Sequence, residues 1–117
     1  MENTVLCASS KYEEKYYLNP EFDGLPDAVK DELKAMCVLF VEDIGGILTM
    51  EFDEECRLSF VTRSDEEDIL YDEIGSVLKV KQLREVKKEL LESLELYYRV
   101  FFKGEKIEEG QKDVISN

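Results

Sequence analysis

The sequence predicts an α+β fold in the order β-α-β-β-α-α, in which a small antiparallel sheet, formed by a hairpin and an N-terminal strand, packs against two main helices. Residues 45–62 alternate between apolar and polar on both sides of a charged turn, and apolar stripes with helical spacing flank that segment. The length of 117 residues is that of one domain. We therefore expect a single domain over residues 1–104 and a disordered, charged tail over residues 105–117.

The N-terminal region gives the weakest pattern. Residues 1–10 show no periodicity and are predicted to be loose or extended. Residues 11–19 are rich in tyrosine and end at Asn19-Pro20, which favours a strand followed by a turn. A helix remains an alternative there, because Ser10 and Glu13 have the spacing of a capping box.

The first helix is predicted to begin at Leu25-Pro26, because proline at the first helical position has a preset φ and lacks only an N–H that would be unpaired. Apolar residues recur every three or four positions from Val29 to Val41 and form one stripe. Gly45-Gly46 supplies the left-handed conformation that commonly ends a helix.

A β-hairpin is predicted next, with Leu48, Met50 and Phe52 on the buried face of its first strand and Leu58, Phe60 and Thr62 on that of its second. In the turn, Cys56 occupies a position where φ is often positive and where glycine is common. We interpret this cysteine as a tolerated surface substitution rather than a reactive thiol.

The C-terminal third is predicted to form two helices. Ser64 and Glu67 have capping-box spacing, and the apolar run Ile69-Leu70-Tyr71 with Ile74 completes a short helix. One helix from Asp65 to Phe102 would be about 57 Å long, whereas a domain of this size has a radius of gyration of about 13 Å. We therefore expect a break at Gly75-Ser76 and a long helix from about Ser76 to Lys103.

The end of the long helix is apolar on almost every side, which implies that it is covered either by the sheet and first helix or by a partner subunit. Its residues are the predicted interface: Leu94, Tyr97, Tyr98, Phe101 and Phe102.

The residue types argue against most catalytic chemistry. The chain has no histidine, which removes the commonest general base and zinc ligand. Cys7, Cys37 and Cys56 are an odd number without CxxC spacing, so neither a disulfide framework nor a zinc knuckle is expected. Cys37 is interpreted as a small buried hydrophobe. The acidic clusters lack the spacing of an EF-hand loop, and we expect no catalytic residues, cofactor or metal site.

Charge is distributed unevenly along the chain, whose net charge is −13. The segment from Glu42 to Glu73 contains twelve carboxylates and only two cations, Arg57 and Arg63, so its net charge is −10. From Lys79 to Lys88 there are five cations and one carboxylate. The overall acidity argues against general affinity for nucleic acid or anionic membranes. We expect the basic segment to meet an acidic one, in the same chain or in a second copy.

Five segments together resemble a small bacterial family of uncharacterised proteins: KYEEKYYLNPEF, LPDAVKDELK, VEDIGGILTMEF, LYDEIGS and LELYYRV. The resemblance extends to about Gly104. It implies a single-domain bacterial cytosolic protein and carries over no activity, cofactor or functional residue.

The sequence leaves the biochemical activity unknown and favours a non-catalytic, cytoplasmic interaction module that forms a homo-oligomer or binds a protein partner. No window is apolar enough over about 18 residues to span a membrane. One alternative is an acidic decoy that occupies the basic groove of a nucleic-acid-binding protein. Another is a weak metal-dependent enzyme that uses carboxylates to hold Mg²⁺ or Ca²⁺.

Overall fold

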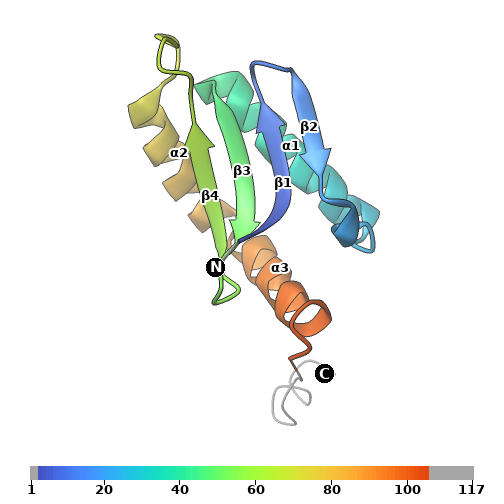
Figure 1. The fold of residues 1–117 in the computed structure, drawn as a ribbon. Helices are drawn as coiled ribbons and strands as arrows, with labels where there is room; N and C mark the ends of the chain where they lie inside the picture. The colour runs from blue at the N-terminus through green and yellow to red at the C-terminus, as the bar shows by residue number, and fades with distance from the viewer. Residues whose placement is uncertain (1–2, 106–117) are drawn as a thin grey trace.

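The computed structural model describes residues 3–105 and shows a four-stranded antiparallel sheet with α-helices on one face (Figure 1). The elements in chain order are β1 (Thr4–Ser10), β2 (Lys15–Leu18), a 3₁₀ turn (Pro20–Phe22), α1 (Asp27–Ile44), β3 (Ile47–Phe52), β4 (Leu58–Arg63), α2 (Glu73–Val86) and α3 (Lys88–Phe101). The predicted α+β class is confirmed. The expected tail beyond residue 105 lies outside the described residues.

The sheet order is β2-β1-β3-β4, so the N-terminal strand lies at its centre. Of the two alternatives expected for residues 1–10, loose or extended, the structure shows the extended one for Thr4–Ser10, as a paired strand that the prediction did not include. A bulge between Val5 and Cys7 explains the missed pattern, because it buries the consecutive residues Leu6 and Cys7 and so hides the alternation. The strand interpretation of residues 11–19 is confirmed for Lys15–Leu18, which pairs with β1 across a tight turn.

The hairpin of β3 and β4 and the helix before it match the prediction. Leu48, Met50 and Phe52 are fully buried on the face toward the helices. Cys56 has the expected positive φ of 65°. Its side chain is nevertheless buried in the core, so its interpretation as a surface residue was wrong.

The C-terminal helices differ from the prediction in where they break. Residues 64–72 form a loop instead of a short helix, and Gly75 lies inside α2 rather than between two helices. Asp72 caps α2 by accepting a hydrogen bond from the Gly75 N–H at 2.8 Å. The break falls instead at Lys87, whose ψ of 21° ends α2 before α3 begins. The expected long helix is therefore two helices of 14 residues each.

The core lies between the sheet and the helices. Its fully buried large side chains come from β1, the 3₁₀ turn, α1, β3 and β4: Leu6, Phe22, Leu33, Phe40, Leu48, Met50, Phe52 and Leu58. α3 closes one end of this core with Leu91, Leu94 and Tyr98.

Candidate interaction surface

Five exposed apolar residues of the described chain lie in the first half of α2 or in the loop before it. Their exposed fractions are 93% for Ile69, 86% for Leu70, 77% for Ile74, 68% for Val77 and 62% for Leu78. We call these five residues the α2 outer surface. Single exposed hydrophobic side chains are ordinary, but a cluster of this kind marks a surface suited to contact with another molecule.

The helical geometry explains why these side chains point outward. Ile74, Val77 and Leu78 have the i, i+3, i+4 spacing that places them on one face of α2. Ser76 is buried, and Val80 and Leu83 pack against the core from the opposite face. α2 therefore has an apolar stripe on each side, and only one of them is covered within the chain.

Opposite charges lie on either side of the helical part of this surface, Ile74, Val77 and Leu78, whereas Ile69 and Leu70 lie within the acidic segment itself. Residues 65–73 contain six carboxylates and no cation, whereas residues 79–88 contain five cations and one carboxylate. Lys81 is exposed and lies seven residues, or about two helical turns, beyond Ile74 on the same face of α2. The surface thus has an acidic end and a basic end.

Three of the cations also bind within the chain, and one of them, Lys79, pairs with a carboxylate of the acidic stretch from Glu42 to Glu73. Lys79 forms an ion pair with Asp43 at 3.7 Å. Lys87 Nζ donates to Glu32 Oε2 at 2.8 Å. The Arg84 guanidinium donates to the Leu58 carbonyl at 3.2 Å and lies over the Phe60 ring.

The acidic loop is held in place by Tyr12. Its hydroxyl donates to Asp68 Oδ2 at 2.5 Å and accepts from the Asp65 N–H at 3.0 Å. The hydrogen bond to Asp68 raises the pKa of Tyr12, because it stabilises the protonated phenol. Glu66 and Glu67, between these anchors, are exposed.

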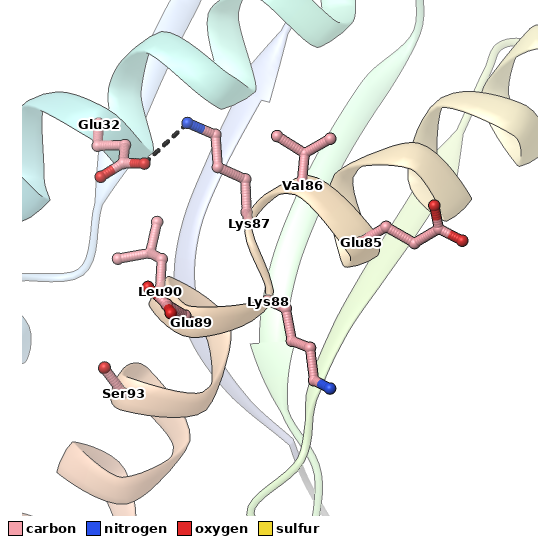
Figure 2. Close-up of a pocket in the computed structure, with 8 residues that line it drawn as sticks. All are labelled: Glu32, Glu85, Val86, Lys87, Lys88, Glu89, Leu90 and Ser93. Atoms are coloured by element: carbon pink, nitrogen blue, oxygen red, sulfur yellow. Dashed lines mark hydrogen bonds and ion pairs between the residues drawn. The ribbon is translucent and has the colours of Figure 1, made fainter.

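An open hollow of about 650 Å³ lies where α2 ends and α3 begins, beside α1. Figure 2 shows Lys87 reaching from this junction to Glu32, while Glu85 and Lys88 point away from them. The one cation directed across the hollow is thus neutralised by a carboxylate, and the charged groups do not converge on a common point as an acid–base pair would require.

The predicted interface residues on α3 fall into two groups. Leu94 and Tyr98 are buried within a single chain, where Tyr98 stacks on Phe52 with ring centroids 4.2 Å apart. Tyr97 and Phe102 are partly exposed, and Phe101 is 71% exposed. The core of the same chain therefore accounts for the burial of Leu94 and Tyr98.

Within residues 3–105, no group of three or more His, Cys, Asp or Glu side chains is placed to hold a metal ion. No helix in this range is long and apolar enough to cross a membrane.

Comparison with known proteins identifies the family. A model of a family of unknown function, DUF6145, matches residues 3–106, which is nearly the whole chain. The chain belongs to the DUF6145 family. No curated protein and no solved structure matches it. The resemblance to an uncharacterised family is thus confirmed, and no activity comes with it.

Sequence reasoning missed the α2 outer surface of this DUF6145 protein. The sequence predicts Ile69, Leu70 and Ile74 only as the apolar run of a short helix. A usable signal was present: with the helix starting at Glu73, the apolar residues of α2 occupy two opposite faces, which is more than one packed face requires.

Proposed function

We propose that this DUF6145 protein is a non-catalytic module that self-associates, with the α2 outer surface as its contact to a second copy. The observation that carries the proposal is the exposure of five apolar side chains, all at least 62% exposed, of which two lie within the acidic segment 65–73 and three lie between it and the basic segment 79–88. Burying such side chains against a partner stabilises the complex by roughly 25 cal/mol for each Å² of apolar surface removed from water.

Charge complementarity selects a second copy as the occupant. If two α2 helices pair antiparallel, residues 65–73 of one copy lie beside residues 79–88 of the other. The same contact then occurs twice, as in any twofold interface. A parallel arrangement would instead place the six carboxylates of each copy side by side. The antiparallel homodimer therefore joins the apolar surfaces and pairs the opposite charges.

Paired point variants test the surface. Leu78→Glu places a charge on the α2 outer surface, and we expect it to convert dimers to monomers in sedimentation velocity. Leu39→Glu is the matched control, because Leu39 is 63% exposed but lies on α1. Dissociation by Leu39→Glu, or none by Leu78→Glu, would place the interface elsewhere.

The charge pairing has its own test. Because exposed charges are screened by salt, the dimer should weaken between 0.05 and 0.5 M NaCl, on the order of a few-fold in dissociation constant. Lys81→Glu should weaken it at low salt and leave little salt dependence. An unchanged dissociation constant in this variant would exclude the antiparallel arrangement.

A second candidate function is an acidic decoy for a nucleic-acid-binding protein, and the exposed carboxylates of Glu66 and Glu67 favour it. Glu66→Lys with Glu67→Lys reverses the charge without touching the Tyr12 hydrogen bonds to Asp65 and Asp68. The decoy hypothesis predicts that the wild type captures nucleic-acid-binding proteins and that added DNA displaces them from it. The double variant should no longer capture these proteins. Unchanged capture would rule the hypothesis out.

We place the protein in the cytosol as part of the same proposal. Its three cysteines are free thiols, which is typical of a reducing compartment.

A further inference from the structure

Three sulfur atoms from separate elements meet in the core, on the side of the sheet covered by α1. Cys7 lies on β1, Cys37 on α1 and Met50 on β3. The Cys7 and Cys37 Sγ atoms are 3.6 Å apart, and Cys37 Sγ lies 3.6 Å from Met50 Sδ. All three residues have no exposed surface. The fold thus brings two thiols and a thioether together away from water.

We propose that Cys7, Cys37 and Met50 form a binding site for a soft monovalent metal ion, Cu(I). Thiolate and thioether ligands select Cu(I), whereas Mg²⁺ and Ca²⁺ require oxygen ligands. Structural zinc sites require four ligands, usually from cysteine and histidine. This chain has no histidine, and its third cysteine is in the β3–β4 turn. The ligand set therefore favours copper in its reduced state.

A buried hydroxyl beside these sulfur atoms supports the site. Tyr16 Oη is buried and makes no hydrogen bond, which is uncommon for a buried polar atom. The thiols of Cys7 and Cys37 are its neighbours. Tyr16 is therefore a hydrogen-bond donor without an acceptor, next to a thiol that would become an acceptor once deprotonated.

The charge balance of Cu(I) binding is consistent with Tyr16 acting as a hydrogen-bond donor to the bound thiolate. One Cu⁺ would replace the protons of two thiols, which are released to solvent, and the ion with two thiolates carries a net charge of −1. The Tyr16 O–H can stabilise that charge by donating to Cys7, because hydrogen bonds to ionised groups are stronger than neutral ones. The apolar surroundings otherwise disfavour an uncompensated charge.

A route for the ion would pass Tyr16. A pocket of about 400 Å³ between the β1–β2 turn and α1 is lined by Ser9, Tyr16, Val38 and Val41 among others. Tyr16 belongs to β2, a four-residue edge strand that pairs only with β1. Displacement of this short strand or of its tyrosine would open the pocket toward Cys7.

The test is anaerobic titration of the full chain with Cu(I) against a chromophoric Cu(I) chelator. We expect one ion per chain, with an ultraviolet thiolate-to-copper charge-transfer band. Cys7→Ser and Cys37→Ser should each abolish stoichiometric binding, while Cys56→Ser should bind as the wild type does. Circular dichroism of each variant reports whether it is folded.

X-ray absorption of the copper-loaded wild type does not depend on any variant folding. We expect sulfur as the only nearest neighbour of the ion. Failure of the wild type to compete for Cu(I), nitrogen or oxygen neighbours only, or retained binding in folded Cys7→Ser would overturn the proposal. It stands independently of self-association, since the sulfur atoms lie in the core and not on the α2 outer surface.

Discussion

Lys87 donates a hydrogen bond to Glu32 at 2.8 Å, so the residue between α2 and α3 is linked to the N-terminal half of α1. Both side chains are partly exposed, at 30% and 39%, which limits the strength of their ion pair. We predict a coupling free energy of about 0.5 kcal/mol. A double-mutant cycle with Glu32→Gln and Lys87→Met in urea denaturation measures it. A coupling of zero would contradict a stabilising contribution from this pair.

Asp72 is predicted to set the beginning of α2. Asp72→Ala removes the acceptor of the Gly75 N–H and should lower the free energy of unfolding by about 1 kcal/mol. Asp72→Asn keeps an effective cap and should cost much less. Equal losses in the two variants, measured by urea denaturation, would contradict a capping role.

Gly45 and Gly46 join α1 to β3 with φ values of +93° and +69°. A Cβ at either position strains the left-handed backbone by about 1 kcal/mol. Only at Gly46 would the Cβ also press against the Arg63 carbonyl and the Tyr71 ring. Gly46→Ala should therefore destabilise the fold by about 1–3 kcal/mol more than Gly45→Ala. Thermal and urea denaturation of the two variants would show whether they differ in this direction.

Cys37 makes the stability depend on pH in alkaline solution. The hydrogen bond with Cys7 and burial raise the pKa of Cys37 above its ordinary value of 9.0. The folded chain therefore keeps a proton that the unfolded chain loses, so this stability is complete below pH 9 and declines above it. The slope is at most about 1.4 kcal/mol per pH unit for one thiol. Urea denaturation between pH 8 and 10 should show a shallower decline in Cys37→Ala, and an identical decline would contradict this origin.

The sequence predicted an element correctly where the periodicity of its apolar residues matched a single buried face. The stripe of α1 and the alternation of β3 each face a single core, so periodicity identified them. β1 was not predicted as a strand, because its bulge buries the consecutive residues Leu6 and Cys7. Residue alternation carries no record of such a bulge.

The C-terminal helices show a different limit. Gly75 suggested a helix break, yet a side chain there would clash with the Asp72 carboxylate that caps α2. The glycine thus permits the cap. The actual break at Lys87 has neither glycine nor proline, and contacts with α1 such as that of Glu32 lie far away in the sequence. Which side chains lie on the α2 outer surface depends on where α2 begins and ends. The surface could therefore be identified only from the fold.

The molar mass in solution tests the central claim most directly. Size-exclusion chromatography with light scattering at high micromolar concentration should give twice the 13.6 kDa of one chain, and Leu78→Glu should give 13.6 kDa. A wild-type mass of 13.6 kDa across the whole concentration range would contradict self-association through the α2 outer surface.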